Sequence, residues 1–126
     1  MDKPIREVMT DVCDPEESRV AFVRDLFGRL GDKWSVRTLN QLADGPLRFT
    51  AVMNAMPGIS HRILTVTLRT LESDGMVSRT AYAETPPRVE YALTPLGESF
   101  LCRSLSLVAW AQDHQQEIEA NRAARR

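Results

Sequence analysis

Cysteine and histidine are scarce in this chain, which limits the chemistry that it can carry. There are two cysteines, Cys13 and Cys102, and two histidines, His61 and His114. Two cysteines are too few for a disulfide framework, and neither has a second Cys or a His at zinc-ligand spacing. We therefore expect no structural metal and no cofactor.

Long apolar runs and catalytic motifs are also missing. No apolar run approaches the roughly 18 residues that indicate a membrane span, and the charged start MDKPIREV lacks the apolar core of a signal peptide. There is no glycine-rich phosphate loop, and no Ser, Cys or Asp stands in a recognisable nucleophile setting. At 126 residues, the chain is expected to form one compact cytoplasmic domain that is not an enzyme.

The formal net charge is −1, but the positive charges are unevenly distributed. Residues 33–70 carry five Lys or Arg against one Asp or Glu, whereas residues 1–32 carry five against eight. A local excess of positive charge is typical of a nucleic-acid binder, although ordinary solvated charges give the same count. Charge alone leaves both interpretations open. The positive residues of the basic segment are Lys33, Arg37, Arg48, Arg62 and Arg69.

A segment near the middle of the chain has the pattern of an amphipathic helix. Leu64, Leu68 and Leu71 recur at helical spacing and predict a face that packs on the core. Ser60 is a suitable N-cap, and Asp74-Gly75 is a stop signal because glycine enters the left-handed conformation at little cost. The opposite face is predicted to consist of Arg62, Thr65, Val66, Arg69 and Ser73.

After this helix the apolar pattern changes to alternation. Residues 76–82 and 88–94 predict two β-strands, and Pro86 and Pro87 lie in the connection between them. Proline lacks a backbone donor and cannot sit inside a paired strand, so both prolines belong to a stiff hairpin tip. A helix that leads directly into a hairpin is the arrangement that a winged DNA-binding domain needs.

Three shorter helices are predicted before this pair. They span residues 18 or 19 to 30, residues 33–43 with Asp32 as N-cap, and residues 49–56. The third is joined to the amphipathic helix by a tight turn at Pro57-Gly58, which makes a helix-turn-helix. The expected fold class is mainly α with a small β-hairpin (α+β), a winged helix-turn-helix with N- and C-terminal dimerisation helices.

A final helix is predicted from Pro95 to about Asn121. Its apolar residues cover roughly half of the helical wheel, which is wider than packing on one small domain needs. We infer that it packs against a second copy of the chain. The predicted parts are an N-terminal arm (1–17), a winged helix-turn-helix domain (18–114), a dimerisation helix (95–121) and a basic tail (122–126). The residues assigned to dimerisation are Leu101, Leu105, Val108 and Trp110.

Four separated motifs resemble one known family. They are GDKW at residues 31–34, GPLRF at 45–49, GISHRILTVTLRTLESDGMVSR at 58–79, and PPRVEYALTPLG at 86–97. In this order and at these intervals, residues 20–114 resemble HxlR-type winged-helix transcriptional regulators. The resemblance implies a cytoplasmic bacterial homodimer that places a recognition helix in the major groove and a wing at the neighbouring minor groove or backbone. We expect a sequence-specific DNA-binding regulator that represses genes from a palindromic operator.

The recognition helix supplies most of the expected DNA contacts. Arg62 and Arg69 can pair with a guanine edge or grip a phosphate. Thr65 and Val66 can contact thymine methyl groups, although Val66 departs from the polar residue that family members often carry there. The helix start favours a bound phosphate, and the residues expected there are Ser60 and His61, the latter equally compatible with a solvated role.

Further phosphate contacts are expected outside this helix. Arg48 is assigned to such a contact from the preceding short helix, and Arg79 and Arg88 from the wing. For Arg88 the alternative is a cross-strand ion pair with Glu84 or Glu90. The sequence does not decide between the two roles.

Cys13 is the candidate for a redox or electrophile sensor, since some HxlR-type proteins use a cysteine near their N-terminus in this way. In the family pattern that cysteine lies about where Val20 or Ala21 stands, so Cys13 is displaced by roughly two helical turns. The acidic residues around it disfavour the reactive thiolate, and we expect little redox response. Cys102 is expected to be a small core or interface residue.

A winged helix used only for protein contacts is the main alternative function, because fold does not fix function. The pair Arg62 and Arg69 discriminates between the two, since a purely protein-binding module would not need it. The expected partners are double-stranded DNA, a second copy of the chain and an unidentified small-molecule or redox effector. No membrane partner is expected.

Overall fold

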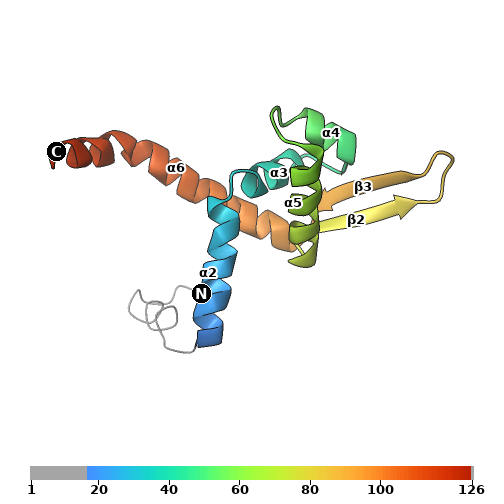
Figure 1. The fold of residues 1–126 in the computed structure, drawn as a ribbon, viewed down its shortest axis with the longest axis horizontal. Helices are drawn as coiled ribbons and strands as arrows, with labels where there is room; N and C mark the ends of the chain where they lie inside the picture. The colour runs from blue at the N-terminus through green and yellow to red at the C-terminus, as the bar shows by residue number, and fades with distance from the viewer. Residues whose placement is uncertain (1–16, 126) are drawn as a thin grey trace. The chain divides into compact units, whose positions relative to one another are not determined.

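The computed structural model describes residues 17–125 and is mainly helical with one small antiparallel sheet (Figure 1). The chain divides into two units, one ending at Lys33 and one beginning at Trp34, and each is described by itself. This architecture confirms the fold class that the sequence predicted. The elements in chain order are α2 (Glu17–Gly31), α3 (Ser35–Gln41), β1 (Leu47–Arg48), α4 (Phe49–Asn54), α5 (His61–Ser73), β2 (Val77–Tyr82), β3 (Arg88–Leu93) and α6 (Pro95–Ala123).

The first unit contributes the helix α2, close to where the sequence predicted it. Its apolar side chains do not form a buried face of their own. Phe22 and Phe27 are exposed, while Val23 and Leu26 are partly covered. The helix therefore exposes the aromatic rings of Phe22 and Phe27 on its surface.

The start of α3 corrects the sequence prediction. The helix begins at Ser35, two residues after the predicted start at Lys33, and the backbone N–H of Asp32 still bonds to the Gly28 carbonyl of the preceding helix at 2.9 Å. The N-cap position is Trp34, whose side chain makes no capping hydrogen bond. The buried face of α3 also includes Ser35 and Thr38. Because their side chains are polar, apolar periodicity does not predict that they are buried.

A short strand was missed by the sequence analysis. β1 pairs with β3, with Leu47 opposite Tyr91 and Arg48 opposite Glu90, so the sheet has three strands in the order β1-β3-β2. Two residues are too few to show an alternating pattern, and their pairing depends on residues far away in the sequence. The following helix α4 ends at Asn54, slightly before the predicted end.

The amphipathic helix α5 confirms the prediction at both ends. The Ser60 hydroxyl accepts a hydrogen bond from the backbone N–H of Ile63 at 3.1 Å, and Gly75 has the positive φ of 81° that ends the helix. Leu64, Leu68 and Leu71 are at most 1% exposed. Burial of each such leucine contributes roughly 1.5–3 kcal/mol, so this face anchors α5 in the core.

The predicted hairpin is formed by β2 and β3, which are antiparallel from Val77 opposite Leu93 to Tyr82 opposite Arg88. It projects away from the group of helices formed by α3, α4 and α5 (Figure 1). The residues of the tip are exposed. This hairpin is the wing.

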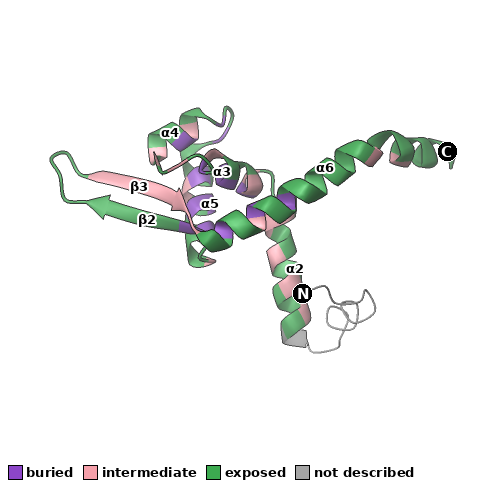
Figure 2. Ribbon diagram, turned by 180° about the vertical axis from the view of Figure 1, so that it is seen from behind, coloured by how far each residue is buried: buried purple, intermediate pink, exposed green. Residues whose placement is uncertain are grey.

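Helix α6 begins inside the core and leaves it after about three turns. Thr94 caps the helix by accepting from the Gly97 N–H at 3.0 Å, and its own hydroxyl donates to the Gly75 carbonyl at 2.6 Å. Gly97, Leu101 and Ser104 are buried, whereas the later turns are mostly exposed (Figure 2). No helix of residues 17–125 is both long and apolar enough to cross a membrane.

The core of the second unit gathers where α3, α5, the base of β2 and the start of α6 meet (Figure 2). Leu101 is 4% exposed and belongs to this core, which corrects its assignment to a dimerisation surface. The buried apolar residues are Leu39, Leu42, Val52, Met56, Ile59, Leu64, Leu68, Leu71, Met76, Val77 and Leu101.

Candidate nucleic-acid interface

One row of α5 side chains faces solvent. It consists of Arg62, Val66 and Arg69, on the side of the helix opposite the buried leucines, and Val66 is 53% exposed. Among residues 17–125, neither arginine has a hydrogen-bond or ion-pair partner. Both guanidinium groups are therefore available to bases or phosphates without breaking an existing contact.

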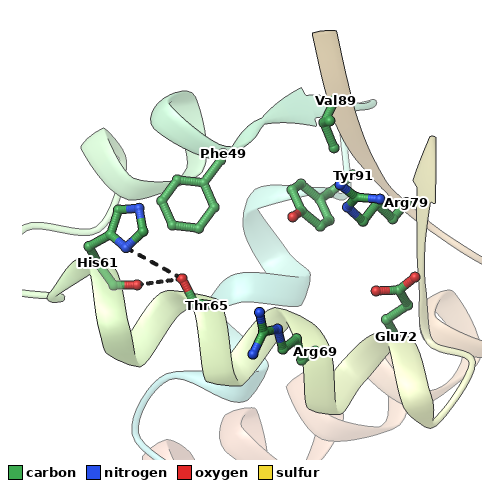
Figure 3. A pocket seen from close by; sticks show the side chains of 8 residues that line it. All are labelled: Phe49, His61, Thr65, Arg69, Glu72, Arg79, Val89 and Tyr91. Carbon is green, nitrogen blue, oxygen red and sulfur yellow. Dashed lines mark hydrogen bonds between the residues drawn. The ribbon is translucent and has the colours of Figure 1, made fainter. Parts of the chain in front are cut away.

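A second row of α5 faces the sheet instead. Thr65, predicted to share the face of Arg62 and Val66, is only partly exposed, and its hydroxyl donates to the His61 carbonyl at 2.8 Å. The His61 ring lies against Phe49, with 4.6 Å between ring centroids (Figure 3). Thr65 and His61 are thus turned toward the wing side of the helix.

This second row forms one wall of a cleft between α5 and the sheet (Figure 3). The cleft has a volume of about 490 Å³ and is open on one side. Sequence analysis did not detect it, because its residues come from α4, α5, β2 and β3 and meet only in the fold. The lining residues are Phe49, His61, Thr65, Arg69, Glu72, Arg79, Val89 and Tyr91.

The two wing arginines lie on opposite faces of the hairpin. Arg79 pairs across the strands with Tyr91, and both line the cleft. Arg88 pairs with Tyr82 and lies three residues before Tyr91 on β3. Because successive side chains of a strand alternate between faces, Arg88 lies on the face opposite Arg79. The sequence predicted phosphate contacts for both but did not separate the faces.

Arg88 forms the ion pairs that the sequence analysis gave as its alternative role. Its Nη2 lies 2.9 Å from Oε2 of Glu84, and its Nε lies 3.8 Å from Oε2 of Glu90. The guanidinium carbon also stands 4.1 Å from the ring centroid of Tyr82. These contacts connect the tip to both strands and partly neutralise the charge of Arg88.

The remaining predicted contact residues lie at helix starts. Arg48 is exposed at the N-cap of α4 and lies opposite Glu90 in the pairing of β1 with β3. Because Glu90 and Arg88 are two residues apart on β3, Arg48 lies on the same face of the sheet as Arg88. The Ser60 side-chain oxygen already accepts the capping bond from Ile63, so any phosphate contact would use its hydroxyl proton.

The cysteines are placed differently by the structure. Cys102 is exposed on α6 of the single chain, so it is not a core residue as one of the sequence alternatives held. Cys13 lies outside the described residues. Within the described part of the chain, no group of at least three His, Cys, Asp or Glu side chains could hold a metal ion.

A family model for the HxlR-like helix-turn-helix matches residues 29–119. The chain belongs to this family. Its HxlR-like segment includes α3 to β3 and most of α6, so the matched region contains the whole cleft and the exposed α5 row. The resemblance found in the four sequence motifs is thereby confirmed.

Relatives of this HxlR-like protein are described as regulators of transcription. An uncharacterised HTH-type transcriptional regulator of Methanothermobacter thermautotrophicus is 43% identical over 90 residues, which cover 69% of each protein. The solved structure of the putative transcriptional regulator ytfH from Salmonella typhimurium is 35% identical, with a TM-score of 0.67, covering 80% of this chain and 90% of that one.

A third similar protein is described as the redox regulator HypR, solved in its oxidised form. It is 35% identical with a TM-score of 0.65, and the match covers 72% of this chain and 94% of that one. With the family match, these neighbours support a DNA-binding transcriptional regulator with a winged helix-turn-helix fold.

Proposed function

We propose that the protein is a cytoplasmic homodimer that represses transcription by binding a palindromic operator in a sequence-specific manner. The observation that carries the proposal is the exposed α5 row, in which Arg62 and Arg69 have no partner among residues 17–125 while the opposite face is fixed in the core. A major groove admits an α-helix, and arginine is the side chain that most often reads guanine there.

Each contact has a role that its geometry supports. Arg62 and Arg69 reach base edges or flanking phosphates, and the apolar Val66 between them suits a thymine methyl group. On the wing, Arg79 is free of ion pairs within residues 17–125 and is the stronger candidate for a phosphate contact, because Arg88 is already held by two glutamates. Arg48, Ser60, His61 and Thr65 add weaker contacts around the helix start.

The proposed dimer rests on apolar side chains that the single chain leaves in water. On α6, Leu105 and Val108 are exposed, and Trp110 is 52% exposed. Phe22 and Phe27 of α2 add two exposed rings. Several large apolar side chains left exposed on successive turns of one helix favour a surface for another protein. A second copy fits the proposed operator, because a palindrome has two half-sites about 34 Å apart.

Fluorescence anisotropy tests specific binding. The full chain is titrated into labelled DNA from the intergenic region upstream of its gene, and into random DNA of equal length, at several salt concentrations. We expect tighter binding to the intergenic DNA, typically by about 10³-fold or more at physiological salt. If every fragment of the upstream region bound with the same affinity as random DNA, sequence-specific regulation would be contradicted.

A variant pair then tests the α5 assignment. Arg62→Ala should weaken operator binding, while Arg103→Ala, which removes an exposed arginine of α6, should leave it unchanged. A transcriptional reporter fused to the same promoter tests the direction of regulation. Deletion of the gene should raise reporter expression if the protein represses, and a fall in expression would identify an activator.

A further inference from the structure

We propose that the cleft between α5 and the sheet binds a small aromatic monocarboxylate. Its volume of about 490 Å³ lies within the range of roughly 300–1,000 Å³ that small-molecule sites occupy. Such sites combine apolar and aromatic walls with a few converging polar groups, and both are present here. The consequence for DNA binding, derived below, rests on the proposed function.

The charges of the cleft match a single negative charge. Arg69 enters from α5 and Arg79 from β2, and Glu72 lies on the α5 wall (Figure 3). Within the described residues, none of these three side chains forms a hydrogen bond or an ion pair. Two guanidinium groups and one carboxylate leave an excess of one positive charge. A monocarboxylate would neutralise it and accept paired hydrogen bonds from a guanidinium group.

The walls of the cleft favour a planar ring over an inorganic anion. Phe49 and Tyr91 lie on opposite sides of the space above α5, and Val89 adds an aliphatic surface (Figure 3). The Phe49 ring is held by its tilted contact with His61. Aromatic rings gain from stacked or edge-to-face contacts with one another, whereas a phosphate gains nothing from such walls. A hydroxyl group on the ligand ring would find an acceptor in Glu72.

Arg69 connects the cleft to the DNA-binding surface. It lines the cleft and also belongs to the exposed α5 row with Arg62 and Val66. A carboxylate bound to Arg69 removes this guanidinium from DNA and adds a negative charge beside the phosphates. Since binding free energies are reciprocal, a ligand that excludes DNA weakens DNA binding by the factor 1 + [L]/Kd. The regulator would therefore release its operator when the acid accumulates.

Isothermal titration calorimetry of the full chain without DNA tests the site directly. Benzoate and 3-hydroxybenzoate are the probes, and benzamide and inorganic phosphate are the comparisons. We expect both carboxylates to bind, benzamide not to bind, and phosphate to bind more weakly. Arg79→Gln should lower the affinity for benzoate by about tenfold or more, because a hydrogen bond to a charged group is lost. The control Arg103→Gln, on α6, should bind benzoate as the wild type does.

Three outcomes would overturn the assignment. These are no benzoate binding up to tens of millimolar, binding that Arg79→Gln leaves unchanged, or phosphate binding as tight as benzoate binding with the same dependence on Arg79. The last result would identify a general anion-binding site suited to the phosphates of the DNA backbone. Arg79 is exposed and without a partner among residues 17–125, so the variant is expected to fold, and thermal melting verifies this.

Anisotropy with operator DNA separates this proposal from the proposed function. Benzoate should lower operator affinity by the factor calculated from its calorimetric Kd. If benzoate binds in the cleft but operator affinity does not change, the competition is wrong while the site stands. If the protein binds benzoate but no DNA, the proposed regulator function is wrong and the site again stands. If it binds DNA but no carboxylate, only the cleft assignment fails.

Discussion

The backbone carbonyl oxygen of Met76 occupies the space that a Cβ atom on Gly97 would need. Gly97 lies in the first turn of α6, and Met76 immediately precedes β2. The same junction is tied by Thr94, which bonds to both the Gly75 carbonyl and the Gly97 N–H. The start of α6 thus packs directly against the turn that follows α5, which fixes the wing relative to α5.

Replacement of Gly97 by alanine should therefore destabilise the fold. The added methyl group overlaps backbone, which cannot move aside as a flexible side chain can, so we expect a loss of about 1–3 kcal/mol. Urea denaturation followed by circular dichroism measures the change. Gly28→Ala in α2 is the matched control, because its Cβ meets no described atom within 4 Å and alanine favours helix by about 1 kcal/mol. Equal stability of Gly97→Ala and wild type would show that the junction can relax.

Local signals explain why much of the fold could be predicted from the sequence. The Ser60 cap, the leucine spacing of α5 and Gly75 are all read within a few residues, and each held in the structure. The strand β1 could not be found in this way, because its two residues become a strand only by pairing with β3. Leu101 was also misplaced, since helical spacing does not tell which of several apolar stripes meets the core.

The candidate site was predictable in part, for a related reason. The exposed positions of Arg62 and Arg69 follow from the helical wheel alone. The cleft does not, because Phe49, Tyr91 and Arg79 lie on separate elements and converge only after the sheet has formed. The orientation of Arg88 depended on strand register and on the nearby glutamates, which sequence analysis gave as an open alternative.

The ion pair between Arg88 and Glu84 leads to a prediction for the wing. Glu84→Gln should strengthen binding to all DNA by about two- to fivefold at low salt, because it releases Arg88 and removes a negative charge from the tip. Arg88→Ala should lower the affinity for operator and random DNA by similar factors. The control Glu117→Gln removes an exposed carboxylate of α6 instead. Anisotropy with random DNA is the measurement, and an affinity of Glu84→Gln equal to that of the control would show that Arg88 serves only to brace the hairpin.

Dimerisation should depend on the exposed part of α6. Trp110→Glu and Val108→Glu place a charge on the proposed interface and should yield monomers at micromolar concentration in sedimentation velocity. Truncation before Pro95 is less informative, because it also removes the buried Leu101 and Ser104. Gln116→Glu, also on exposed α6, is the control. A wild-type chain that sediments only as a monomer would contradict the dimer itself.

Redox sensing by Cys13 is expected to be weak. Its acidic neighbours disfavour the thiolate that an oxidant or a quinone attacks, so oxidant should change operator binding little, and Cys13→Ser should behave as the wild type does. Cys102→Ser is the companion variant, because Cys102 is exposed on α6 of the single chain. A clear oxidant response that vanished in Cys13→Ser alone would identify Cys13 as a sensor, and the expectation would be wrong.

The last prediction separates base reading from phosphate binding on α5. Because Arg62 and Arg69 are exposed and have no partner among residues 17–125, alanine at either position should change stability by less than about 0.5 kcal/mol. Loss of a base contact should cost about 1–3 kcal/mol, mainly on the operator. Loss of a phosphate contact should weaken operator and random DNA alike and reduce the salt slope by about one.

Anisotropy on both DNAs across a salt series, with Arg103→Ala as control, distinguishes the two roles for each arginine. Arg69 should behave as the phosphate-binding member, because it borders the cleft on the wing side of the helix, while Arg62 lies away from the cleft. If both variants bound operator and random DNA at wild-type strength, α5 would not be the reading element, and a module for protein contacts would explain the exposed arginines better.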